Sequence, residues 1–127
     1  MLPEFSSREN IDLPQLSNGV SSKDAQQRSN ELLALVNLDK RSDHRPSELS
    51  GGEQQRVAIC RALANKPKII LADEPTGNLD QKTTSSVFET LQKIVKQTNL
   101  AALIATHNID LANRMDRVVK LSDGKLI

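Results

Sequence analysis

The chain has 127 residues, a formal net charge of +1, and 37% hydrophobic and 26% charged residues, which are ordinary values for one globular domain or a piece of one. This near-neutral balance, together with two Phe and no Trp or Tyr, argues against nucleic acid as a partner, since bases would find little charge and almost no aromatic ring to stack on. The single cysteine, Cys60, excludes an intrachain disulfide and fits a reducing compartment. We read no signal peptide and no membrane-spanning run in the sequence.

Residues 1–48 are predicted to be mainly helical. Ser6 precedes Glu9 at the spacing of a capping box and opens a short helix that we expect Pro14 to stop. Ser22 is the expected cap of a second helix, whose small and apolar residues share one face: Ala25, Ser29, Leu32, Leu33 and Val36. The polar stretch 38–48 is predicted to be a loop.

A third helix is predicted to begin at Ser50, which stands at capping-box spacing from Glu53, and to end before Pro67. Gly51 and Gly52 fall in its first turn, where each costs roughly 1 kcal/mol relative to alanine. They leave the backbone N–H groups uncovered, and a helix N-terminus of that kind attracts anions. The same residues also fit an ordinary helix start softened by glycine.

From residue 67 onward, strands and helices alternate. Two apolar runs, 68–75 and 100–107, flank a helix at 81–97 that carries one apolar stripe: Val87, Phe88, Leu91, Ile94 and Val95. A short helix capped by Asn108 is expected at 109–115, then a strand at 117–121 and a hairpin turn at Asp123-Gly124. Strand, helix and strand in this order predict an α/β fold with a parallel sheet covered on both faces.

Polar residues follow both apolar runs. Asp73 and Glu74 end the first run, at the carboxyl edge of the sheet where ligands bind. Two adjacent carboxylates there indicate that one holds Mg²⁺ and the other polarises an attacking water. His107 ends the second run and could reach the same edge. Simpler readings also fit: a solvated acidic turn, a structural histidine, and a helix N-cap for Asp80.

Four stretches in this order together resemble the nucleotide-binding subunit of ABC transporters. They are LSGGEQQ at 49–55 for the signature, IILADE at 69–74 for the Walker B strand and its glutamate, GNLD at 77–80 for the D-loop, and ATH at 105–107 for the switch histidine. Residues 44–80 are most similar to one bacterial group of these subunits, and within it to the ATPase that powers lipoprotein release, with a MacB-type subunit as the open alternative. The stretch LPEFSSRENIDLP at 2–14 resembles the segment that follows the Q-loop in the same group. The resemblance implies a partial P-loop NTPase (ABC ATPase) fold of the α/β class. It places the helical subdomain with the signature motif at 1–66 and the Walker B part of the RecA-like core at 67–127.

The resemblance also implies roles for single residues. Ser50, Gly51 and Gly52 would contact the γ-phosphate of ATP bound mainly to the second ATPase subunit of a head-to-tail dimer, with Gln54 beside them in the nucleotide site. Asp73 would position Mg²⁺, Glu74 would be the general base, and His107 would contact the γ-phosphate. Asp80 would link the two sites of the dimer. The implied partners are permease transmembrane subunits, which would hold the chain peripherally on the cytoplasmic face of the inner membrane.

One departure from the family pattern is large, because no G-x-x-x-x-G-K-[ST] occurs in the sequence. In the family, the Walker A loop, the Q-loop glutamine and the adenine-stacking aromatic residue would precede Met1. We therefore expect the C-terminal part of an ABC ATPase that is inactive alone, with the strand at 102–105 bare on one edge. Two alternatives stay open: a non-catalytic remnant or interaction module, which the coding DNA upstream of Met1 would reveal, and a soluble DNA-repair ATPase, although the sequence has no coiled-coil insertion.

Overall fold

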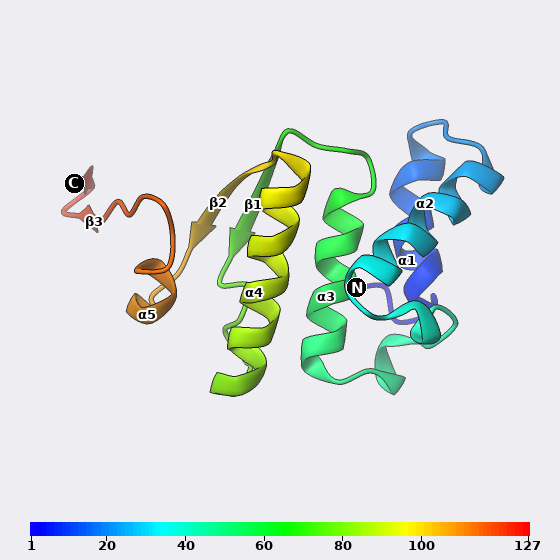
Figure 1. Ribbon diagram of the computed structural model, residues 1–127, viewed down its shortest axis with the longest axis horizontal. Helices are drawn as coiled ribbons and strands as arrows, with labels where there is room; N and C mark the ends of the chain where they lie inside the picture. Colours follow the sequence, from blue (N-terminus) through cyan, green and yellow to red (C-terminus); the bar gives the residue numbers. More distant parts are fainter.

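The computed structural model describes all 127 residues as helices on one side and a small parallel sheet on the other (Figure 1). In Figure 1, α4 stands between α3 and the strands β1 and β2. The elements, in chain order, are α1 (Ser7–Ser17), α2 (Ser22–Leu35), two 3-10 turns (Asp39–Arg41 and Pro46–Glu48), α3 (Gly51–Leu63), β1 (Ile69–Asp73), α4 (Gln81–Thr98), β2 (Ala101–Ala105), α5 (Ile109–Ala112), β3 (Leu121–Ser122) and β4 (Lys125–Leu126).

Helix α1 begins where the sequence predicts it to begin but does not end there. The Ser6 Oγ accepts from the Glu9 N–H at 3.2 Å, which confirms the capping box. The expectation that Pro14 stops the helix is wrong, because Pro14 lies inside α1. An interior proline removes one N–H donor and crowds the carbonyl four residues earlier, but here the buried Gln15 next to it joins the end of α1 to α2. Its amide nitrogen donates to the carbonyl of Ile11 at 3.1 Å and to that of Ala25, in α2, at 3.2 Å.

The N-cap of helix α2 lies one residue before the predicted one. Ser21, and not Ser22, is the N-cap, with its Oγ accepting from the Asp24 N–H at 3.2 Å. The predicted face of α2 is buried as expected, down to Val36 at the C-cap. The predicted loop at 38–48 contains the two 3-10 turns, which close through local bonds such as Arg41 N–H to the Leu38 carbonyl at 2.9 Å.

One hydrophobic core runs through both halves of the chain. Its 16 buried residues come from α1, α2, α3, β1 and α4 and from the segments that join them. Helix α4 contributes the predicted stripe, with Val87, Leu91 and Ile94 almost fully buried. The boundary between residues 66 and 67 stays a prediction, since apolar packing continues across it.

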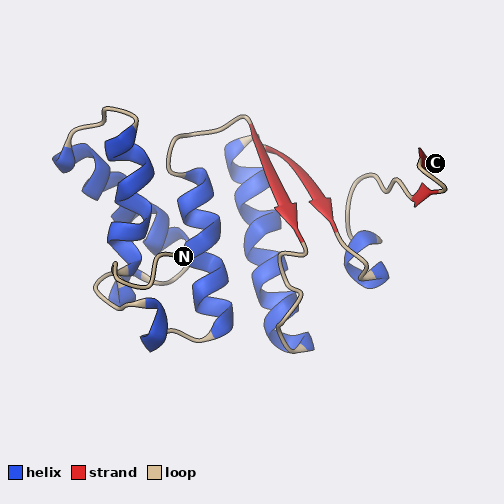
Figure 2. Ribbon diagram, turned by 180° about the vertical axis from the view of Figure 1, so that it is seen from behind, coloured by secondary structure: helices blue, strands red, loops and turns tan.

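Strands β1 and β2 pair in parallel, with Ile69 opposite Ala101 and Asp73 opposite Ala105. Figure 2 shows the two strands side by side along α4. Because successive side chains point to opposite faces, Ile70 is buried in the core while the paired Leu71 and Leu103 are 71% and 58% exposed. The prediction of a sheet covered on both faces is therefore wrong for these 127 residues, and β2 pairs with β1 alone, as expected for its bare edge.

The C-terminal segment is less regular than predicted. Helix α5 ends at Ala112 instead of Met115, although Asn108 caps it as expected. Only the end of the predicted strand at 117–121 is extended and paired, as β3 with β4. The connecting Asp123 and Gly124 have φ of 49° and 75°, which confirms the predicted hairpin turn of the primed type. None of the five α-helices is long and apolar enough to cross a bilayer.

Candidate functional site

The ends of two helices and two strands that carry or adjoin predicted site residues lie toward the same end of the molecule. Figure 1 shows the N-terminal ends of α3 and α4 and the carboxyl ends of β1 and β2 pointing in the same direction. Ser50 caps α3, Asp80 caps α4, Asp73 ends β1, and His107 follows β2. The parallel pairing of the strands and the direction of the helices that connect them produce this gathering.

The first turn of α3 is closed by the capping box that the sequence predicts. The Ser50 Oγ accepts from the Glu53 N–H at 3.2 Å, and the Glu53 carboxylate accepts from the Ser50 N–H at 2.8 Å. Arg41 approaches the same carboxylate, with its Nε 3.7 Å from Oε1. The Ser50 N–H, its hydroxyl and the Arg41 charge hold the pKa of Glu53 below its usual range. Glu53 is thus a fixed anion at a helix N-terminus, the position that favours negative charge.

Gln54 has a structural task in addition to its predicted one. Its amide nitrogen donates to the carbonyls of Pro46 at 2.9 Å and Leu49 at 3.3 Å. These bonds fix the 3-10 turn that leads into α3. A contact between Gln54 and nucleotide stays a prediction.

Gly51 and Gly52 have a packing role that the sequence does not reveal. A Cβ added at Gly52 would lie 2.5 Å from the Cγ2 of Thr83 in α4, and one added at Gly51 would lie 3.0 Å from the Cδ2 of Leu79. A contact under 3 Å requires something to shift, so Gly52 lets the start of α3 approach the start of α4, while the Leu79 side chain would have to move slightly for a Cβ at Gly51. This packing requirement stands beside the exposure of backbone N–H groups.

Glu74 and His107 meet directly at the carboxyl edge of the sheet. The backbone N–H of His107 donates to the Glu74 Oε1 at 2.6 Å, and the His107 Nδ1 lies at the same distance from that oxygen. Thr106 donates through its hydroxyl to the other carboxylate oxygen at 3.1 Å. The Glu74 side chain is 34% exposed and that of His107 is 84% exposed. The pair is consequently open to a ligand arriving from solvent.

The backbone turns sharply at Glu74 to bring its side chain to His107. Glu74 has a φ of 43°, while its N–H still donates to the Ala105 carbonyl of β2 at 2.8 Å and its own carbonyl accepts from Gly77 at 3.1 Å. Partial loss of solvent around the carboxylate raises its pKa, but the bonds from the His107 backbone, the His107 ring and Thr106 outweigh that effect and lower it. Glu74 is therefore ionised at neutral pH, as a general base must be.

Asp73 lies at the exposed end of β1, one residue before the turn. No group of three His, Cys, Asp or Glu side chains in the chain is arranged to hold a metal ion by itself. A single carboxylate nevertheless fits Mg²⁺, which keeps several waters and binds one or two protein carboxylates together with the phosphates of its substrate. Asp73 thus fits a metal that arrives with a nucleotide and does not fit a permanent all-protein site.

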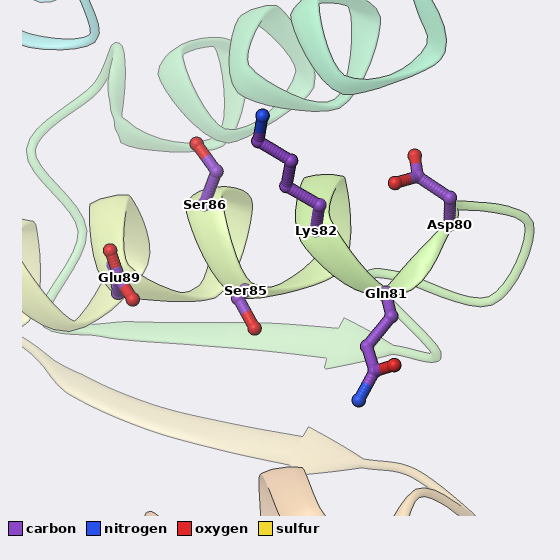
Figure 3. Close-up of a pocket in the computed structure, with 6 residues that line it drawn as sticks. All are labelled: Asp80, Gln81, Lys82, Ser85, Ser86 and Glu89. Atoms are coloured by element: carbon purple, nitrogen blue, oxygen red, sulfur yellow. The ribbon is translucent and has the colours of Figure 1, made fainter.

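A cleft of about 340 Å³ opens around the Glu74–His107 pair. It is lined by Glu74, Thr76, Gly77, Leu79, Gln81, Thr84, His107, Asn108 and Asp110. Asp80 faces a different hollow along α4, drawn in Figure 3, where Lys82 and Ser86 extend toward α3 while Gln81 and Ser85 extend to the opposite side. The Asp80 carboxylate accepts from the Thr83 N–H at 3.2 Å, and bonds from Thr83 lower its pKa. The helix-cap reading of Asp80 is confirmed.

Thr106 is the residue of the cleft region that sequence reasoning missed. Besides donating to Glu74, its hydroxyl accepts from the Asn108 N–H at 3.1 Å. The sequence did offer one signal, the hydroxyl of Thr106 directly before His107 at the end of the second apolar run. Only the parallel register of β1 and β2 shows that this hydroxyl meets the carboxylate of Glu74.

Carboxylates and a histidine lie at the carboxyl edge of a parallel sheet, with helix N-termini at the same end. This is the place where open α/β proteins bind ligands and where helix N-termini attract anions. The family model described as ABC transporter matches residues 1–77, which is more than half of the chain. The chain belongs to the ABC transporter family.

Named relatives and solved structures agree with this assignment. The chain is 65% identical over all its residues to the lipoprotein-releasing system ATP-binding protein LolD of Ruegeria sp. (strain TM1040), and 61% identical to the LolD of Paramagnetospirillum magneticum (strain ATCC 700264 / AMB-1). It spans 56% of the length of each of these relatives.

Two dimeric structures of the ATP-binding cassette MJ0796, one of them in a post-hydrolysis state with ADP and Pi, superpose with a TM-score of 0.81 at 38% identity. They match 99% of this chain and 56% of the cassette. The expected fold class, part of the P-loop NTPase fold of ABC ATPases, is confirmed.

Proposed function

We propose that this chain forms the signature and Walker B part of the ATP-hydrolysing subunit of an ABC transporter that releases lipoproteins from the inner membrane. The observation that carries the enzymatic part is the Glu74 carboxylate, ionised and bonded to His107 and Thr106 at the open edge of the sheet. The cargo is inferred from the identity of 65% and 61% with proteins named for lipoprotein release.

In this proposal Glu74 takes a proton from the attacking water. The bonds from Thr106 and His107 reach the carboxylate from β2 and aim it into the cleft. The His107 ring turns Nδ1 toward Glu74, which leaves its Nε2 to meet the γ-phosphate. Bound Mg-ATP supplies the phosphoryl group and the charge of the metal, and Asp73 is the residue that would hold that metal.

The N-terminus of α3 serves a nucleotide on the second ATPase subunit. Gly51 and Gly52 offer first-turn N–H groups and the helix dipole to an anion beside the Ser50 cap, whose own N–H is bonded to Glu53, and Gln54 stands one turn along. Asp80, at the start of α4, would link the two sites of a head-to-tail dimer. Support comes from the dimeric arrangement of the cassette that this chain resembles.

The remaining partners follow from the same family. We place permease transmembrane subunits against the subunit, and the subunit itself peripherally on the cytoplasmic face of the inner membrane. The near-neutral charge and the scarcity of aromatic side chains support a protein partner over nucleic acid.

The test exchanges single carboxylates in a complete subunit, in which residues 1–127 replace the matching segment of the Ruegeria relative. Glu74→Gln is expected to lower the rate of ATP hydrolysis by at least about 10²-fold while nucleotide binding persists, because the amide keeps the shape but cannot accept the proton. Asp73→Asn is expected to weaken the Mg²⁺ dependence of nucleotide binding instead. Hydrolysis is measured as phosphate release and binding by calorimetry.

Glu31→Gln is the matched control, since it is the same exchange at an exposed carboxylate of α2, outside the residues assigned to the site, where an amide oxygen can also accept the bond from Gln27. Its hydrolysis rate is expected to stay near that of the unchanged subunit. A normal rate in Glu74→Gln would remove Glu74 from the role of general base.

A further inference from the structure

The first turn of α3 leaves no room for a side chain on the face that meets α4. Gly52 is buried, and a Cβ there would lie 2.5 Å from the Thr83 Cγ2 and 3.8 Å from the Val87 Cγ2. A Cβ at Gly51 would lie 3.0 Å from the Leu79 Cδ2. We propose that Thr83 is a positioning residue: its methyl group, resting on Gly52, sets where the N-terminal turn of α3 lies.

The α4 side of this contact is rigid. The Thr83 N–H is bonded to the Asp80 cap at 3.2 Å, and the next residue, Thr84, is buried with its hydroxyl 3.4 Å from the Leu79 carbonyl. One turn further, Val87 belongs to the main core. Thr83 is branched at Cβ, which leaves threonine two main rotamers in a helix. Its methyl group therefore has little freedom to move away from Gly52.

The α3 side is equally constrained. The capping box joins Ser50 to Glu53 on both sides of Gly52, so a displacement of Gly52 carries the whole turn with it. About one turn along, the Arg56 Nη1 lies 3.4 Å from the Ser86 Oγ, which is the side of α4 that faces α3 in Figure 3. The two helices thus approach each other at successive turns, and of the two glycines Gly52 is the one whose added Cβ would lie nearer to a side chain, that of Thr83.

The contact also connects the start of α3 to the cleft. Leu79, which packs on Gly51, lines the cleft that holds Glu74 and His107. The turn before α4 is therefore shared by the start of α3 and the catalytic edge. Any use of this link in ATP hydrolysis rests on the proposed function, whereas the positioning itself is a property of the 127-residue chain.

Whether Gly52→Ala raises or lowers the stability of the chain tests the lack of space between Gly52 and Thr83. Helix propensity alone favours alanine over glycine inside α3, so Gly52→Ala would raise the stability of the chain if the space were open. With the Thr83 methyl in place, overpacking reverses the sign. We expect the equilibrium constant for folding to fall by at least about tenfold.

The experiment is a double-mutant cycle in the 127-residue chain, read by chemical denaturation and by amide NMR. Thr83→Ser removes the methyl and keeps the hydroxyl, and it is expected to restore the stability lost in Gly52→Ala. Thr83→Val keeps a methyl at that branch and is the matched control that is expected not to restore it. If Gly52→Ala alone does not fold, the comparison of the two double variants carries the test.

Positioning is read separately from stability. In Gly52→Ala, and more weakly in Thr83→Ser, the amide shifts of residues 51–53 are expected to move more than those of residues 57–60 in the same helix, with a return toward the original values in the Gly52→Ala, Thr83→Ser double variant. A stabilised Gly52→Ala chain, equal rescue by serine and valine, or shifts spread evenly along α3 would each overturn the proposal. None of these results depends on ATP hydrolysis, so they leave the proposed function to its own test.

Discussion

The helical region at 1–66 and the α/β region at 67–127 bury their apolar side chains in different ways. In the first, Ile11, Leu33 and Val57 come from three helices that follow one another in the chain, and all three are fully buried. In the second, the sheet buries Ile70 but exposes Leu71 and Leu103 on its other face. Helices joined by short connections can close a core locally, whereas a parallel sheet needs covering elements from distant parts of a chain.

Polar groups follow the same division. Around α1 and α2, the interior holds a closed network in which Ser29 donates to Asp12 and accepts from Gln15. In the α/β region, the shortest polar contact is the one between Glu74 and His107, and it lies at the open edge. The first arrangement stabilises the fold, and the second stays accessible to a ligand.

The largest expected difference between the two regions is the loss of stability caused by a leucine-to-alanine substitution. Leu33→Ala should lower the free energy of unfolding by about 2–5 kcal/mol, because it leaves a cavity in a closed core. Leu71→Ala removes a side chain that is 71% exposed and should cost less than about 0.5 kcal/mol. Urea titration measures both, and similar losses would show that the outer face of the sheet is covered in solution.

A smaller effect is expected on self-association. The exposed Leu71 and Leu103 sit on paired positions beside the bare edge of β2, and such a surface promotes association between chains. Leu71→Lys together with Leu103→Lys should shift the purified chain toward monomer by sedimentation velocity. Leu16→Lys, an exposed leucine of α1, is the control, and an equal shift there would count against the sheet face.

The smallest effect is a pair of opposite pH dependences. Burial raises the pKa of Asp12 above its usual 3.8, against the bond from Ser29, so the native state holds the proton more tightly and stability falls as pH rises from about 3.8 through the raised pKa. The Thr83 bonds lower the pKa of Asp80, so its contribution is present above about 3.8 and is lost as pH falls below it.

Asp12→Asn and Asp80→Asn should each remove one of these dependences. Thermal unfolding between pH 3 and 7 compares each variant with the unchanged chain. The same pH dependence in both variants would contradict the assignment of a buried acid to one region and an exposed cap to the other.

Local features of both regions follow from the sequence, because their causes are local. The capping residues Ser6, Ser50, Asp80 and Asn108 need only their own first turns. The meeting of Glu74 and His107 follows from parallel strands that end at one edge. Helix α1 continues past Pro14, where the side chain of Gln15 is bonded to α2. The sequence rule for helix-breaking prolines takes no account of such a tertiary contact.

The missed features depend on neighbours that are distant in sequence. The contact of Thr83 with Gly52 depends on how closely α3 approaches α4, and the bond of Thr106 to Glu74 depends on strand register. The predicted strand at 117–121 shortens to its end because a strand forms only where a partner lies alongside. Here Leu121 pairs with β4, and Lys120 exchanges two backbone hydrogen bonds with Ile127.

The left-handed backbone at Glu74 has a consequence for selection. A residue with a Cβ costs about 1–3 kcal/mol in that conformation, and glycine or asparagine adopts it with less strain. A library of variants at this position, sorted only for folded protein, should therefore enrich residues that lack the carboxylate. Under the proposed function, glutamate would be recovered only where growth depends on ATP hydrolysis. This position would then separate sequences selected for stability from sequences selected for activity.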